Sequence, residues 1–159
     1  MRTLARTTRA ATRRDGSYWS ATALALPAIL LFGVVIRLRG LAERPLDGNE
    51  LFTLRILAAP FEELFAPHLV DNGTQFGFYL LAYPWHALLS NLTPPDAALL
   101  RLLPAFFSIA TIPLIYLLTR ESLQGLGLRS HYARALPLLA TALFAASPAA
   151  VQYAQEFRS

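Results

Sequence analysis

The sequence predicts an all-α integral membrane protein, and three observations lead to that prediction. Hydrophobic residues make up 55% of the chain, and the mean hydropathy is +0.41. Long runs without charge recur, and each is long enough to cross a hydrocarbon core of about 30 Å at about 1.5 Å per helical residue. The charged residues fall in the short segments between these runs, as expected for loops at a membrane surface.

The first run predicts a transmembrane helix at 18–37, because Gly16 to Ile36 are 21 uncharged residues. Five arginines lie before it, in a basic tail at 1–17, so the positive-inside rule predicts a cytoplasmic N-terminus. A cleaved signal peptide is disfavoured. The run is longer than a signal core, and Arg37 and Arg39 stand where small residues precede cleavage.

An outer loop with interfacial helices is predicted at 38–97. Residues 50–65 place apolar side chains at helical intervals, which indicates an amphipathic surface helix kinked or broken near Pro60. The apolar run Phe76–Leu89 has only 14 residues and is rich in aromatic rings, which prefer the headgroup level. An interfacial or re-entrant segment is therefore favoured over a fourth crossing. The apolar positions of the surface helix are Leu51, Leu54, Leu57, Ala58, Phe61, Leu64 and Phe65.

Two further spans complete a predicted multi-pass topology in the cytoplasmic membrane. Leu102 to Thr119 are 18 uncharged residues and predict the second transmembrane helix at 98–120. The loop at 121–134 is basic and is therefore predicted to be cytoplasmic. The third helix is predicted at 135–153. Residues 154–159 then begin another outer segment, and we expect that the chain is truncated there.

Composition also restricts function. The sequence has no cysteine, so disulfides and thiolate chemistry are excluded. The isoelectric point is near 10.0, but the arginines are divided among short loops, so contact with membrane lipids is favoured and nucleic-acid binding is not. No cofactor is certain. A divalent metal is compatible with the outer acids, but His68 and His86 lack the neighbouring ligands that would indicate one.

Eight of the ionisable residues on the outer side in this topology come from separated segments and are the candidates for a functional site. Asp47 and Glu50 have the spacing of a capping box, which explains them without any function. Convergence of charges from separated segments favours a functional site instead, and both interpretations stay open at this point. The eight residues are Asp47, Glu50, Arg55, His68, Asp71, Arg101, Glu156 and Arg158.

A series of motifs gives this outer site a chemical interpretation. The series is Pro45-Leu46-Asp47-Gly48-Asn49-Glu50, then Phe78-Tyr79-Leu80-Leu81, then Leu99-Leu100-Arg101-Leu102, then Gln152-Tyr153-Ala154-Gln155-Glu156-Phe157-Arg158. In this order, the motifs resemble the N-terminal part of polyprenyl-phosphate-sugar-dependent glycosyltransferases, which include protein mannosyltransferases and aminoarabinose transferases (glycosyltransferase family 39). The resemblance covers the chain from about residue 18 onwards.

The resemblance implies the N-terminal part of a GT-C transmembrane helix bundle that transfers a sugar from a lipid-linked donor on the outer face, with inversion. The family's outer Asp-Glu pair aligns with Asn49-Glu50. Asparagine cannot accept a proton, so Glu50 or Asp47 would supply the catalytic base. The resemblance assigns the donor phosphate to Arg158 and Arg101. Asn49, Tyr153 and Glu156 are supporting residues.

The partners that this interpretation implies are a lipid-linked sugar donor, membrane lipids, and either missing C-terminal helices or a partner membrane protein. Two of the family's signatures are altered, at Asn49 and at Phe76-Gly77-Phe78. A non-catalytic membrane subunit or degenerate remnant that binds partner helices is therefore the alternative function. The isolated chain is expected to be inactive, because a membrane site needs walls that exclude water and hold both substrates.

Overall fold

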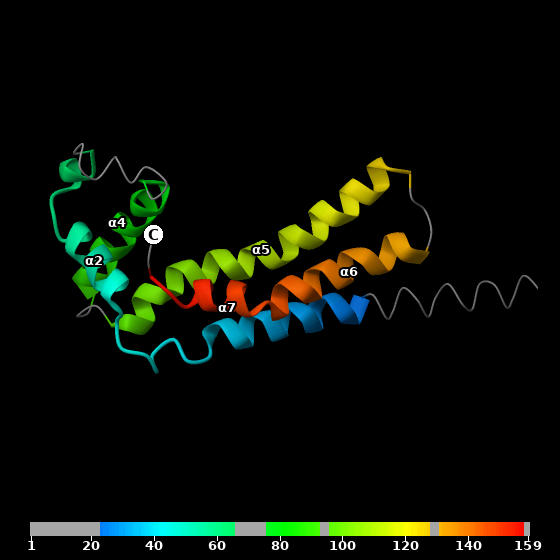
Figure 1. Ribbon diagram of the computed structural model, residues 1–159, viewed down its shortest axis with the longest axis horizontal. Helices are drawn as coiled ribbons and strands as arrows, with labels where there is room; N and C mark the ends of the chain where they lie inside the picture. The colour runs from blue at the N-terminus through cyan, green and yellow to red at the C-terminus, as the bar shows by residue number, and fades with distance from the viewer. Residues whose placement is uncertain (1–22, 66–75, 93–95, 128–130, 158–159) are drawn as a thin grey trace, which may run out of the picture. The chain divides into compact units, whose positions relative to one another are not determined.

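A computed structural model describes residues 23–65, 76–92, 96–127 and 131–157 (Figure 1). The regular structure of these residues is helical and contains no strand, which confirms the all-α prediction for this part of the chain. The elements are a helix at Ala23–Leu38, α2 at Gly48–Leu57, the 3₁₀ helix η1 at Phe61–Phe65, α4 at Phe76–Leu92, α5 at Ala97–Gly125, α6 at His131–Ala146 and α7 at Pro148–Ala154.

The chain divides into two compact units. The first unit comprises Met1–Gly33 and Ile112–Ala145, and the second comprises Val34–Thr111 and Ala146–Ser159. The candidate site residues predicted from the sequence belong to the second unit, as do α2, η1, α4 and α7. The second unit is therefore the part of the fold that bears on function.

Helix α5 is long and apolar enough to cross a membrane, and it is the only single helix of the described residues that meets this test. It has 29 residues and begins one residue before the predicted span at 98–120. Helix α5 continues into the predicted loop at 121–134 and ends at Gly125. The chain then turns at Gly127, whose φ of 70° suits glycine, and α6 begins at His131.

The third transmembrane helix predicted at 135–153 is interrupted in the structure, because the chain breaks between α6 and α7. Proline at position 148 disfavours helical backbone at the residue before it, and Ser147 is extended, with φ −61° and ψ 118°. Its side chain accepts a hydrogen bond from the Ala150 N–H at 3.4 Å and so caps the new helix. Only if the two helices are counted together do they make a second candidate span.

The helix predicted at 18–37 is described from Ala23 to Leu38, and residues 18–22 lie outside the described part. This described stretch is apolar but shorter than the length needed to qualify alone as a span. Its last turn is followed by Gly40, whose φ of 81° reverses the chain toward α2.

The break predicted near Pro60 is confirmed, since α2 ends at Leu57 and η1 begins at Phe61. The predicted apolar positions are divided between buried residues, such as Leu57, and exposed ones. Leu51 is 54% exposed, whereas Glu50 is buried together with Thr53 and Ile56. Glu50 lies on the buried side of α2, where its carboxylate forms an ion pair with Arg101.

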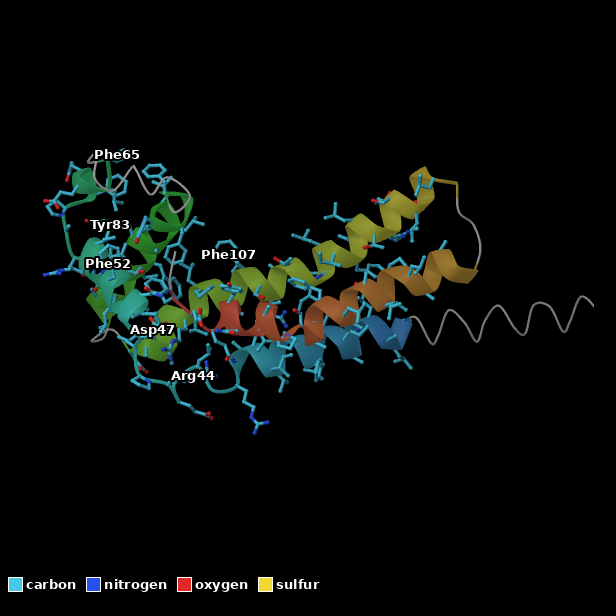
Figure 2. The ribbon with its side chains drawn as sticks, in the orientation of Figure 1. Arg44, Asp47, Phe52, Phe65, Tyr83 and Phe107 are labelled. Carbon is cyan, nitrogen blue, oxygen red and sulfur yellow. The ribbon has the colours of Figure 1, made fainter. Side chains whose placement is uncertain are left out.

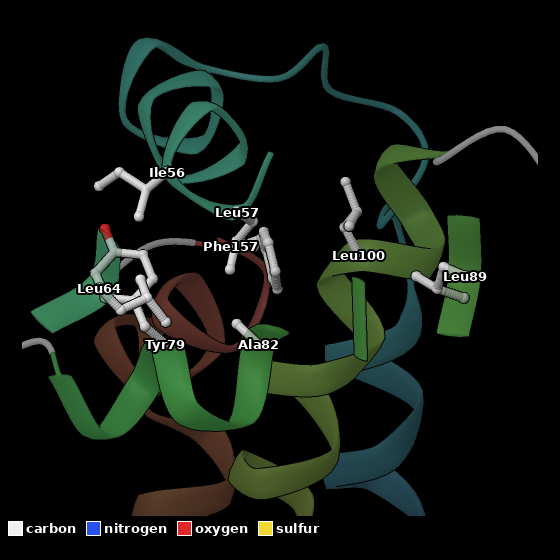
Figure 3. Packing of buried hydrophobic residues seen from close by; sticks show 8 residues of the cluster. All are labelled: Ile56, Leu57, Leu64, Tyr79, Ala82, Leu89, Leu100 and Phe157. Atoms are coloured by element: carbon white, nitrogen blue, oxygen red, sulfur yellow. The ribbon is translucent and has the colours of Figure 1, made fainter. Parts of the chain in front are cut away.

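The apolar core of the second unit joins segments that are distant in the sequence. Figure 3 shows Ile56 and Leu57 of α2 in one cluster with Tyr79 and Ala82 of α4. Phe157, from the segment after α7, is completely buried in the same cluster. Polar anchors support it, since the Tyr83 hydroxyl donates to Ala59 O at 3.2 Å and Trp85 Nε1 donates to Leu99 O at 3.1 Å.

Candidate functional site

Asp47 and Glu50 form a reciprocal capping box at the start of α2. The Glu50 N–H donates to Asp47 Oδ1 at 2.8 Å, and the Asp47 N–H donates to Glu50 Oε2 at 3.1 Å. Figure 2 shows Asp47 at the entrance to this helix, close to Arg44 in the preceding stretch. The structural explanation of the Asp-x-x-Glu spacing is therefore correct, and it fixes where α2 begins.

Glu50 has a second and stronger partner, which the sequence did not indicate. Arg101, near the start of α5, donates from Nε to Glu50 Oε1 at 2.8 Å and from Nη2 to Glu50 Oε2 at 2.6 Å. The two side chains are 1% and 4% exposed. This is a buried bidentate ion pair, the geometry in which a guanidinium binds a carboxylate best.

The remaining N–H groups of Arg101 hold the chain that leads into α2. Nη1 donates to the carbonyls of Leu41 and Arg44, both at 2.8 Å, and Nη2 donates to the carbonyl of Pro45 at 3.0 Å. A guanidinium has five N–H donors. All of them are used, so Arg101 folds residues 41–45 around itself while it neutralises Glu50.

The Glu50 carboxylate is equally occupied. Besides Arg101 and the Asp47 N–H, the N–H of Phe157 donates to Oε1 at 2.8 Å. Burial by itself raises the pKa of the Glu50 carboxyl, but the hydrogen bonds from Arg101, Phe157 and Asp47 outweigh burial and hold that pKa below its usual value. Glu50 is therefore ionised and has four hydrogen bonds on its two oxygens.

This geometry bears on two assignments made from the sequence, which stay predictions. A general base must reach the proton that it accepts, and Glu50 is buried with its acceptor positions filled. A phosphate clamp needs free donors, and Arg101 has none. The contacts give both residues a structural role: together they join α2, α5 and the segment after α7.

Asp47 keeps the features that a base requires. It is exposed, and no described residue donates a hydrogen bond to its Oδ2. The adjacent residues Gly48 and Asn49 are exposed as well, and a Cβ added at Gly48 would meet nothing within 4 Å. The Asp47 carboxylate is thus exposed at the start of α2 and is followed by exposed residues.

Two other predicted site residues lie on α7 or directly after it. Tyr153 is 64% exposed on α7. Glu156 accepts a hydrogen bond from Gln152 Nε2 at 3.0 Å. Arg158, His68 and Asp71 lie outside the described residues, so the structure says nothing about their assignments.

Sequence reasoning also missed the contacts of two polar side chains in the second unit. Arg37 is completely buried and donates from Nε to Ser108 Oγ at 2.8 Å, a contact between the first helix and α5. Gln155 donates to backbone carbonyls at the end of the first helix. A buried charge requires a partner of opposite charge. Opposite charges near the ends of apolar runs could therefore have indicated that Glu50 and Arg101 pair.

Among the described residues, no group of three histidine, aspartate, glutamate or cysteine side chains is placed to hold a metal ion. No family model matches the chain, and no curated protein or solved structure shows significant similarity to it.

Proposed function

We propose that the chain is the N-terminal module of a membrane glycosyltransferase that transfers a sugar from a polyprenyl-phosphate donor to an acceptor on the outer face of the membrane. One observation carries the proposal. Three of the motifs on which the resemblance depends meet at Glu50: the motif that contains Glu50 itself, the one that contains Arg101, and the one that contains Phe157. The resemblance predicts that these segments share one site, and their contacts at Glu50 agree with that arrangement.

In this proposal Asp47 takes the role of base. The acceptor oxygen attacks the anomeric carbon as the bond from that carbon to the phosphate oxygen breaks. The acceptor proton passes to the Asp47 carboxylate, and polyprenyl phosphate leaves. Attack opposite the leaving group inverts the anomeric centre. Glu50 and Arg101 contribute by holding the start of α2 rigid, because a displacement of about 1 Å can cost about a hundredfold in rate.

The exposure of α5 supports a location in the membrane. Only 11% of its most apolar window is buried, so α5 does not resemble the core helix of a soluble protein. Phe106 and Leu118 are 65% and 64% exposed on this helix. Exposure of such large apolar side chains to water is unfavourable, whereas contact with lipid chains or partner helices is favourable.

A non-catalytic membrane subunit is the second candidate, and the saturated ion pair favours it. Two of the four residues expected to perform chemistry are occupied by each other, and the family's aspartate is Asn49 here. Such a subunit would use the exposed apolar side of α5 to bind partner helices.

Donor binding separates the two candidates. The chain would be reconstituted in lipid vesicles and irradiated with a photoreactive polyprenyl-phosphate sugar, and attachment would be mapped by mass spectrometry. We expect saturable attachment to the second unit, competed by the unlabelled donor and not by phosphatidylglycerol. Attachment that the unlabelled donor does not reduce would contradict the transferase proposal and favour the subunit.

A further inference from the structure

The segment Gln155–Phe157 makes contacts that its length does not suggest. It follows α7 directly and belongs to the second unit. Its first residue binds the end of the first helix, and its last residue binds α2 and packs beside α4. Two of its three residues thus bind elements that lie more than a hundred positions earlier in the sequence.

Gln155 caps the first helix from outside. Its Nε2 donates to the carbonyls of Arg39 at 2.7 Å and Ile36 at 3.1 Å, with a longer contact to the carbonyl of Arg37 at 3.4 Å. The last carbonyls of a helix have no partner within the helix, so a side-chain donor is needed to satisfy them. Gln155 supplies that donor and ties α7 to the end of the Ala23–Leu38 helix.

Phe157 fills the other end of the segment. Its ring is completely buried, and its centroid lies 5.4 Å from that of Phe78, with the two rings inclined at 62°. Its backbone N–H reaches Glu50 Oε1 at 2.8 Å. Ring and backbone therefore act in different places, because the ring anchors the segment to α4 while the N–H completes the hydrogen bonding of a buried carboxylate.

We propose that Gln155–Phe157 is a latch that holds the start of α2 in place. When the latch is docked, Glu50 has its four hydrogen bonds and the buried side of α2 stays packed against the core of the second unit. When the latch is released, Glu50 loses the Phe157 N–H and the first helix loses its cap. The start of α2, including Asp47, then opens locally while η1 and α4 stay packed. The latch acts on the second unit itself, whatever chemistry that unit serves.

The test uses single cysteines, because the sequence contains none of its own. Thr53→Cys reports on the buried side of α2, since Thr53 is 1% exposed. Leu64→Cys reports on η1, where Leu64 is 3% exposed, and Glu63→Cys supplies an exposed reference. The rate of N-ethylmaleimide labelling is measured for each variant in detergent micelles.

The latch is released by Gln155→Glu, which keeps the shape of the side chain but replaces its donor with a carboxylate that repels the helix carbonyls. Gln124→Glu, at an exposed position of α5, makes the same chemical change elsewhere. We expect Gln155→Glu to accelerate labelling at Thr53→Cys by about tenfold or more, as expected for a lost buried hydrogen bond, and to leave Leu64→Cys protected. Gln124→Glu should change neither rate.

Two outcomes would overturn the proposal. If the labelling of Thr53→Cys is unchanged by Gln155→Glu, the segment does not hold α2. If Thr53→Cys and Leu64→Cys are accelerated together, the segment is an ordinary part of the core, and its loss unfolds the whole unit.

Discussion

Arg101 and Glu50 lie 51 positions apart in the sequence and share two hydrogen bonds of 2.8 and 2.6 Å in the interior of the second unit. Neither side chain has an unused polar atom that faces solvent. Without its partner, each side chain would be a buried and unpaired charge. Loss of either residue should therefore cost more stability than the attraction between the two charges alone.

Removal of one partner should be strongly destabilising. Glu50→Gln is expected to lower the free energy of unfolding by about 3–5 kcal/mol, because it leaves the Arg101 charge buried and uncompensated. Glu63→Gln, an exposed substitution of the same kind, should cost less than about 0.5 kcal/mol. Loss of helical circular dichroism with denaturant in micelles would measure both. Equal midpoints for the two variants would contradict a structural role for the pair.

Arg101→Lys should fail to rescue the fold although it keeps the charge. Lysine has three donors on a single nitrogen and cannot reach a carboxylate and three carbonyls in a planar arrangement. We expect a loss of stability of about 2–4 kcal/mol, whereas Arg55→Lys at an exposed position of α2 should be neutral. The same denaturation experiment measures both, and a near-normal midpoint for Arg101→Lys would show that charge alone is sufficient.

Stability should fall in acid in a way that depends on Glu50. The pKa of this carboxyl is lower in the folded protein than its usual value, so its contribution to stability is complete above the ordinary carboxyl range. That contribution is lost as the pH falls through the lower folded value. Thermal unfolding between neutral pH and about pH 3 should therefore show a steeper decline for the unmodified chain than for Glu50→Gln. Parallel curves would indicate that Glu50 does not titrate with folding.

Asp47→Asn separates catalysis from structure. Asparagine can still cap α2, so folding should be retained. In an active enzyme assembled from the chain and the further helices that the proposal requires, single-turnover transfer from a labelled lipid donor should fall about a hundredfold or more, because the amide cannot take the acceptor proton. A near-normal rate in well-folded Asp47→Asn protein would remove Asp47 from the mechanism.

Cysteine labelling in sealed cells tests whether α5 crosses the membrane. Asp96 and Gln124 are exposed residues near its two ends. We expect a membrane-impermeant maleimide to label Asp96→Cys from outside and to label Gln124→Cys only after the cells are opened. External labelling of both would contradict the predicted topology.

Local features of this fold followed directly from the sequence. The break at Pro60, the capping box and the long apolar helix each depend on neighbouring residues, so proline chemistry, spacing and hydropathy were sufficient to predict them. The break at Ser147 is also local, since Pro148 follows it, but a prediction from apolar runs alone does not include it. The resemblance to sugar transferases and the membrane topology stay predictions.

The roles of Glu50 and Arg101 could not be read in the same way. An exposed carboxylate and a buried one are the same letter in a sequence, and only their partners distinguish a base from a structural anion. Those partners come from α5, from the loop before α2 and from the backbone of Phe157. Tertiary packing decides which segment supplies these partners, and the pattern and spacing of residues in the sequence do not report it.

The contacts of Arg101 also predict that position 101 and the positions it binds differ in their tolerance to mutation. Its donors end on the main-chain oxygens of Leu41, Arg44 and Pro45. Every amino acid carries such an oxygen, so a saturation library should accept many residue types at the exposed positions 44 and 45, whereas the buried side chain of Leu41 restricts position 41. At 101 itself no other side chain supplies the fork, and the same library should return arginine almost alone.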